Sequence, residues 1–164
     1  MSVLKWVSSA RRRFLEIVDS DELKMFQGVV YFCMALAGFY MGFFGSPSVV
    51  RSELGATMNC VWVILTALAP VVVAVGISMV AYGQHRVLNP EAEGGGTPVY
   101  LGWYLQAGGD IGVTMVLLTY VIATFQASWF QRGIFAAFIM SGLALCGSIL
   151  VLRDARKIEA IERL

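Results

Sequence analysis

The sequence predicts an all-α, polytopic helical membrane protein with four transmembrane helices and an N-terminal amphipathic helix. Three observations lead to this fold class. Of the 164 residues, 58% are hydrophobic and only 14% are charged, whereas an average soluble domain is about 25% charged. The mean hydropathy is +0.72, so the chain holds more apolar surface than one soluble core of this size can bury. Long apolar runs alternate with short stretches rich in glycine, proline or charge.

Residues 1–18 form the predicted amphipathic helix. Apolar side chains such as Val3 and Phe14 recur at helical spacing, and the basic residues Lys5 and 11–13 lie mostly elsewhere on the helical wheel. A helix of this kind can lie along a membrane surface with its basic groups towards anionic headgroups. The alternative is a plain cytoplasmic helix whose basic cluster only sets the topology.

Residues 19–164 form the predicted transmembrane domain. Its first span, about residues 23–44, follows an acidic start that favours a helix N-terminus. Within this span Gly38 and Gly42 make a Gly-x-x-x-Gly pattern, and such small residues let a second helix approach closely. The pattern is common in membrane spans, so it indicates helix packing in general and does not specify a dimer.

The second span is predicted at about residues 56–82, after a loop that contains Gly45 and Pro47. Pro70 lies near the middle of this span, where it removes one backbone hydrogen bond and is expected to kink the helix. Such a kink can serve gating, but a static role in packing is the preferred interpretation.

The third span, at about residues 103–129, carries the carboxylate that the sequence singles out, Asp110. If the helix begins well before this residue, Asp110 lies near the middle of the bilayer. If the helix begins at Ile111, Asp110 caps its N-terminus. Because Gly108 and Gly109 directly precede Asp110, a break there is favoured, and the cap is the preferred interpretation. A buried carboxylate in a proton or ion path is the alternative.

The fourth span is predicted at about residues 133–152 and has small residues on its faces, followed by a short, polar, helical tail. Four spans place ten lysines and arginines on the side of the two termini. Arg51 and Arg132 alone fall on the other side. The positive-inside rule therefore predicts a multi-pass protein of the cytoplasmic (inner) membrane with both termini in the cytoplasm.

No sequence motif of a nucleotide site, a hydrolase or a metalloprotease is present. His85 has no neighbour at metal-ligand spacing and is interpreted as solvated. The three cysteines, Cys33, Cys60 and Cys146, are scattered and are interpreted as small packing residues. The sequence therefore predicts a protein that is not an enzyme, with no cofactor, no metal and no nucleic-acid partner.

Three segments resemble small four-span membrane proteins carried by actinobacterial phages. They are Asp-Ser-Asp-Glu-Leu-Lys-Met-Phe-Gln-Gly at residues 19–28, Gly-Trp-Tyr-Leu-Gln-Ala-Gly-Gly-Asp-Ile-Gly at 102–112, and Gln-Ala-Ser-Trp at 126–129. The resemblance covers most of the chain and rests on no motif with an assigned role. Some phage proteins of this size are called holin-like, so the resemblance implies a role in lysis and assigns no functional residues.

Two classes of function follow. The first is a non-enzymatic membrane protein that acts by helix packing and oligomerisation, in a holin-like or accessory role. Its partners would be the lipid bilayer and either further copies of itself or another membrane protein. Regulation of other membrane machinery is not separable from this class by sequence. The alternative is a small ion- or proton-path protein that uses Asp110, with help from Gln106 and Pro70.

Overall fold

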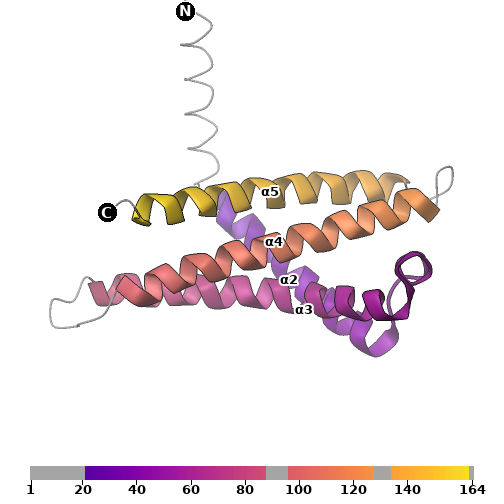
Figure 1. The fold of residues 1–164 in the computed structure, drawn as a ribbon, viewed down its shortest axis with the longest axis horizontal. Coiled ribbons are helices and arrows are strands. Elements are labelled where there is room, and N and C mark those ends of the chain that lie inside the picture. The colour runs from indigo at the N-terminus through magenta and orange to yellow at the C-terminus, as the bar shows by residue number, and fades with distance from the viewer. Residues whose placement is uncertain (1–20, 88–95, 128–133, 163–164) are drawn as a thin grey trace, which may run out of the picture.

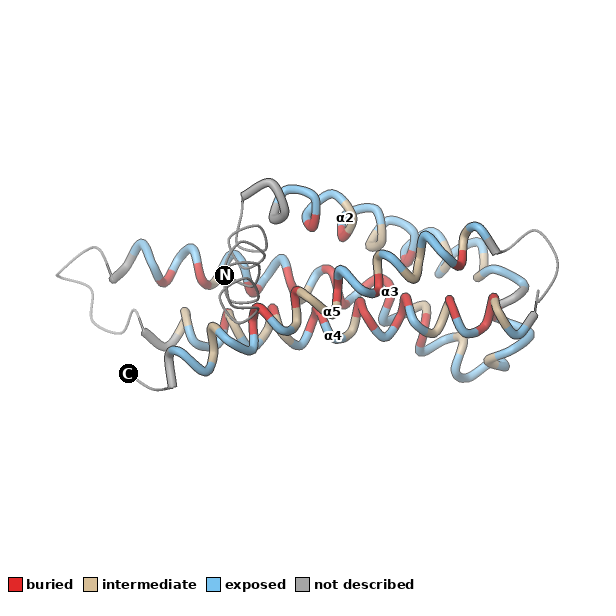
Figure 2. The backbone as a smooth tube through the Cα atoms, turned by 90° about the horizontal axis from the view of Figure 1, so that it is seen from above, coloured by how far each residue is buried: buried red, intermediate tan, exposed pale blue. Residues whose placement is uncertain are grey.

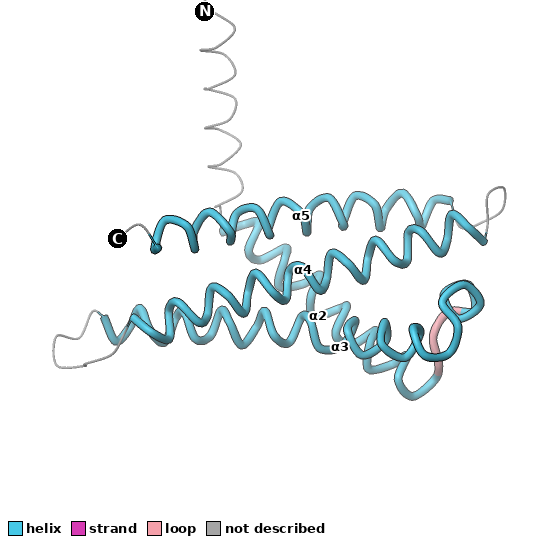
Figure 3. The backbone as a smooth tube through the Cα atoms, in the orientation of Figure 1, coloured by secondary structure: helices cyan, strands magenta, loops and turns pink. Residues whose placement is uncertain are grey.

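The computed structural model describes residues 21–87, 96–127 and 134–162. These segments form the helices α2 (Asp21–Phe44), α3 (Ser48–Val87), α4 (Gly96–Ala127) and α5 (Ile134–Glu162), and no strand occurs in them (Figure 3). All four helices are long and apolar enough to cross a membrane. The predicted all-α fold with four helices of transmembrane length is therefore confirmed. The amphipathic helix predicted at residues 1–18 lies outside the described residues.

The helices pack in chain order: α2 on α3, α3 on α4, and α4 on α5. Figure 1 shows α3, α4 and α5 running lengthwise with α4 in the middle, while α2 crosses them at an angle. The last turns of α3 and α5 and the first turn of α4 share one end of this bundle, which we call the tail end. Figure 2 shows that α2 is exposed along most of its length.

The helix α3 contains one break, at Gly55, where φ is 69° and ψ is 173°. A positive φ is readily adopted by glycine because it has no Cβ. The long part of α3 therefore begins at Ala56, where the second span was predicted. Helical backbone angles continue through Pro70, which is buried. The break in α3 is thus at Gly55. At Pro70, where a kink was expected, the backbone angles are helical.

The helix α4 runs without interruption through Gly108 and Gly109. The prediction that the helix starts after them, with Asp110 as its cap, is therefore wrong. Gly109 instead allows close packing on α3, since a Cβ there would lie 2.9 Å from the carbonyl oxygen of Ala69. Gly108 faces open space. In lipid, a continuous helix is favoured because it satisfies all of its backbone hydrogen bonds internally.

The outer faces of the helices carry many large apolar side chains, as expected for contact with lipid. All three cysteines are exposed on these faces, so their interpretation as packing residues is wrong for this fold. His85 is exposed, as predicted.

Replacing Gly38 and Gly42 separately by alanine tests the packing of α2 on α3. A Cβ on Gly38 would lie 2.6 Å from the Cα of Ala67, whereas nothing lies within 4 Å of a Cβ on Gly42. We expect Gly38→Ala to lower the free energy of unfolding by about 1–3 kcal/mol. Gly42→Ala should be neutral or slightly stabilising, because alanine favours a helix more than glycine does. Thermal unfolding in detergent measures both effects. Equal losses in the two variants would contradict the close approach at Gly38.

Candidate functional site: a buried polar cluster

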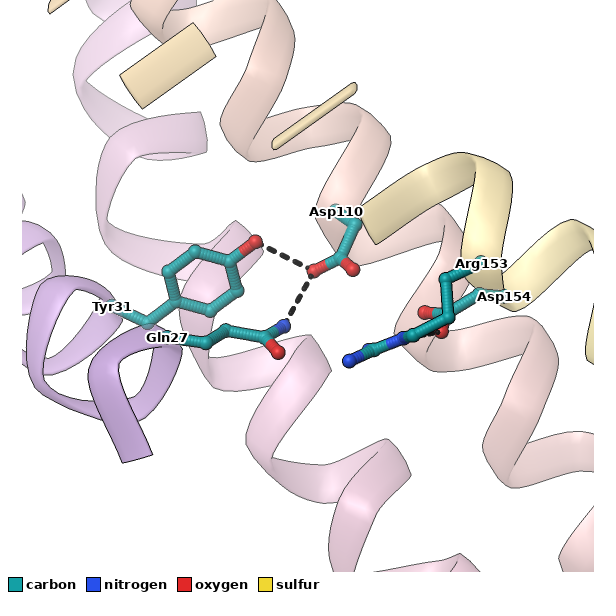
Figure 4. A network of polar contacts seen from close by, with 5 residues as sticks. All are labelled: Gln27, Tyr31, Asp110, Arg153 and Asp154. Carbon is teal, nitrogen blue, oxygen red and sulfur yellow. Dashed lines mark hydrogen bonds and ion pairs between the residues drawn. The ribbon is translucent and has the colours of Figure 1, made fainter. Parts of the chain in front are cut away.

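Asp110 lies in the middle of α4, and its side chain is completely buried. Its Oδ1 atom accepts a hydrogen bond of 2.7 Å from the hydroxyl of Tyr31 and one of 3.2 Å from Nε2 of Gln27 (Figure 4). Gln27 and Tyr31 are four residues apart on α2, so they share one face of that helix. One carboxylate oxygen therefore ties α2 to α4.

A second charged group, from α5, completes the cluster. Nε of Arg153 donates a hydrogen bond of 2.9 Å to Oδ1 of Asp154, and the side chains of the two residues are only 6% and 0% exposed. Figure 4 shows this pair beside Asp110. We call Gln27, Tyr31, Asp110, Arg153 and Asp154 the polar cluster.

Three charged atoms of the polar cluster are buried without a hydrogen-bond partner in the described structure. They are Oδ2 of Asp110, Oδ2 of Asp154 and Nη1 of Arg153. Buried polar atoms in proteins usually have partners, and those that do not require an explanation. Two carboxylates beside one guanidinium also leave one negative charge in excess. The polar cluster can therefore take up a positively charged species at its carboxylates and offer a donor at Arg153.

A cleft of 580 Å³ connects the polar cluster with the tail end of the bundle. Gln27 and Arg153 line the cleft together with Gln84, Gln106 and Lys157. Trp103 also lines the cleft, and Nζ of Lys157 lies over its ring, 4.6 Å from the ring centre. The cleft thus reaches the cluster at Gln27 and Arg153, whereas Asp110 and Asp154 do not line it.

On the other side of Asp110 the interior is packed with apolar side chains. Val113, Val116 and Leu117 follow Asp110 along α4 and are buried. Val113 and Leu117 belong to the same core as Tyr31. The buried side chains of α4 beyond Asp110 are thus mostly apolar, and Thr114 and Thr124 are the buried polar ones.

Only one of the residues singled out in the sequence belongs to this cluster, namely Asp110. Gly109 serves the α3–α4 contact, and Gly38 serves the α2–α3 contact. Gly42 and Gly108 contact nothing beyond their own helices at the position of a Cβ. Pro70 is buried on α3 and lines a mostly apolar groove between α2 and α3, which Gln27 and Tyr31 also line. The structure does not bring these residues together into one site.

Four members of the polar cluster were not predicted from the sequence. Asp154 and Arg153 follow the last apolar run and resemble part of a solvated basic tail. Asp110 was the one carboxylate singled out from the sequence, but Asp154 is equally buried in the structure. A signal for the other two was present: Gln27 is polar within an apolar run, and Tyr31 follows it at helical spacing.

Among the described residues, no group of three or more His, Cys, Asp or Glu side chains could hold a metal ion. Comparison with known proteins finds no family model, no curated protein and no solved structure that matches the chain. The class of the protein therefore rests on its own fold and composition. Four apolar helices of this length fit an integral membrane protein, and in this protein they enclose a buried charged cluster.

Proposed function

We propose that this integral membrane protein binds a proton or a small monovalent cation at Asp110 and Asp154, as part of a proton or ion path. The observation that carries the proposal is the environment of Asp110. One of its oxygens is held by Tyr31 and Gln27, and the other is buried, unpartnered and beside Asp154. Ionisable residues inside membrane spans are expensive and usually mark ion or proton pathways.

The competing interpretation is that Asp110 only ties α2 to α4. Such a link between the two helices needs only a hydrogen-bond acceptor, and a neutral amide also provides one. It does not need a second buried carboxylate or a buried arginine, whose desolvation is costly even when they are paired. The extra charges, together with a cleft that reaches Gln27 and Arg153 of the cluster, therefore favour binding of an ion or a proton. A role without enzymatic chemistry is part of this proposal.

Because mostly apolar side chains fill the interior beyond Asp110, we infer that transfer across the membrane requires the helices to rearrange. The hydrogen bonds from Tyr31 and Gln27 are the polar link between α2 and α4, and α2 otherwise packs chiefly on α3. Neutralising Asp110 would weaken these bonds, since hydrogen bonds to charged groups are stronger than neutral ones. We infer that occupancy of the carboxylate pair controls how firmly α2 is held.

The direct test is flux into liposomes that contain the purified protein and a trapped pH-sensitive dye. For protons, a potassium gradient with valinomycin supplies the driving force. For sodium and potassium, separate runs without valinomycin use a gradient of the cation itself, and a protonophore lets the dye report cation entry. The proposal expects faster dissipation of at least one gradient than in protein-free liposomes. Identical rates with and without the protein, for protons and for both cations, would contradict it.

The holin-like role and the phage origin remain predictions from sequence resemblance. Oligomerisation, which that role requires, is likewise a prediction. If the role holds, induction of the chain in a bacterial host should cause abrupt lysis when an endolysin is co-expressed. Harmless accumulation of the protein in the membrane would contradict it.

The orientation in the membrane is also a proposal, with both termini on the cytoplasmic side because of the distribution of basic residues. Cysteines introduced at Ser48 and at Arg156 should test it, since both positions are exposed and outside the polar cluster. After Cys33, Cys60 and Cys146 are replaced by serine, a membrane-impermeant maleimide should label position 48 in intact cells. It should label position 156 only after permeabilisation. The reverse pattern would show the opposite orientation.

A further inference from the structure

We propose that the cleft at the tail end binds a phosphate group, held by Arg153 and Lys157. The first support is the state of Arg153. This side chain is only 7% exposed, its Nε is bound by Asp154, and its Nη1 is buried without a partner. A carboxylate that fixes one side of a guanidinium leaves the rest of its rigid fork oriented for an anion, and arginine matches phosphate geometry well.

The second support is a cation four residues later on the same helix face. Lys157 lines the same cleft as Arg153, and its Nζ lies over the ring of Trp103. Side-chain amides of Gln27, Gln84 and Gln106 also line the cleft and can donate hydrogen bonds to phosphate oxygens. Two basic groups and several neutral donors therefore converge on one space.

The negative charges of the cluster lie behind these groups. Neither Asp110 nor Asp154 lines the cleft, and Asp154 is already paired with Arg153. A phosphate in the cleft would meet the two cations first. The proposal does not rest on proton binding, because the anion site is built from Arg153 and Lys157.

The size and walls of the cleft indicate two possible sources of the phosphate. A volume of 580 Å³ is far larger than the roughly 30 Å³ that a water molecule occupies in the liquid. Its walls include the exposed apolar residues Met25 and Ile77. The phosphate can therefore belong to the headgroup of an anionic lipid, whose chains lie along these walls, or to free inorganic phosphate. Basic pockets between helices are known to bind phosphorylated headgroups.

The experiment uses the full chain in two parallel arms. In the first, inorganic phosphate is titrated into the detergent-solubilised protein by calorimetry. In the second, the protein is placed in nanodiscs of phosphatidylglycerol and phosphatidylcholine, and the lipid retained after extraction is identified by native mass spectrometry. Saturable binding in the first arm supports free phosphate. Selective retention of phosphatidylglycerol without such binding supports a lipid headgroup.

Variants separate this site from general surface charge. Lys157→Gln should weaken the binding seen in either arm by about fivefold, as expected for the loss of one basic group. Arg156→Gln is the matched control, because Arg156 is exposed and does not line the cleft, and it should leave binding unchanged. The double variant Arg153→Gln with Asp154→Asn removes the buried cation while keeping the charge balanced, and it should abolish binding.

Absence of binding in both arms, or an equal loss in Lys157→Gln and Arg156→Gln, would overturn the proposal. Asp110→Asn distinguishes it from the proposed ion path. This variant removes a negative charge near the cleft while keeping Arg153 and Lys157, so phosphate binding should be retained or stronger even though flux is lost.

Discussion

Replacing Asp110 by asparagine is expected to abolish proton or cation flux while the protein still folds and inserts. Asparagine has nearly the same shape, and its amide oxygen can accept the hydrogen bonds from Tyr31 and Gln27 that now go to Oδ1 of Asp110. It has no carboxylate to hold a proton or a cation. In the liposome assay, the rate should fall to that of protein-free vesicles.

Membrane abundance and thermal unfolding should be measured on the same Asp110→Asn preparation. Neutral amide hydrogen bonds are weaker than those to a carboxylate, but the desolvation of a charge is also removed. We therefore expect a change in stability of no more than about 1–2 kcal/mol. Glu53→Gln is a matched control, because Glu53 is exposed and lies on the first part of α3, away from the cluster. Flux at the wild-type rate in Asp110→Asn would show that Asp110 serves only as a tie.

The helices could be predicted from the sequence because an apolar run that crosses lipid must satisfy its own backbone hydrogen bonds, and a helix does so. The start of the long part of α3 could also be predicted, since Gly55 separates polar loop residues from the apolar run. The start of α4 could not. In soluble proteins, adjacent glycines such as Gly108 and Gly109 often mark the end of a helix. Here α3 lies so close to Gly109 that no larger side chain fits at that position.

The polar cluster could be predicted only in part. Asp110 was found because a carboxylate within an apolar run is rare. Asp154 was missed because it follows Arg153 directly, and an adjacent pair of opposite charges after a membrane span is usually solvated. Its burial depends on how α5 packs against α4. That packing is a tertiary contact, and the hydrophobic pattern of the sequence does not predict it.

Replacing Arg153 alone by methionine is expected to destabilise the protein strongly. The change removes the only hydrogen-bond partner that the described structure gives to Asp154 and leaves two neighbouring buried carboxylates without a cation. Breaking a buried ion pair from one side typically costs about 3–5 kcal/mol. We expect a loss of this size in the free energy of unfolding, and correspondingly low abundance in the membrane.

Adding Asp154→Asn to Arg153→Met should restore most of that stability, because it removes the charge that the first change left unpaired. The double-mutant cycle built from the two single variants and this double variant measures the coupling between the residues. Arg156→Met controls for the loss of a basic residue from the same helix, since Arg156 is exposed, and it should change stability by less than about 0.5 kcal/mol. If Arg153→Met is as mild as Arg156→Met, or if Asp154→Asn gives no rescue, then Arg153 does not compensate the buried carboxylates. The electrostatic account of the cluster would then be wrong, even if Asp110 remained essential for flux.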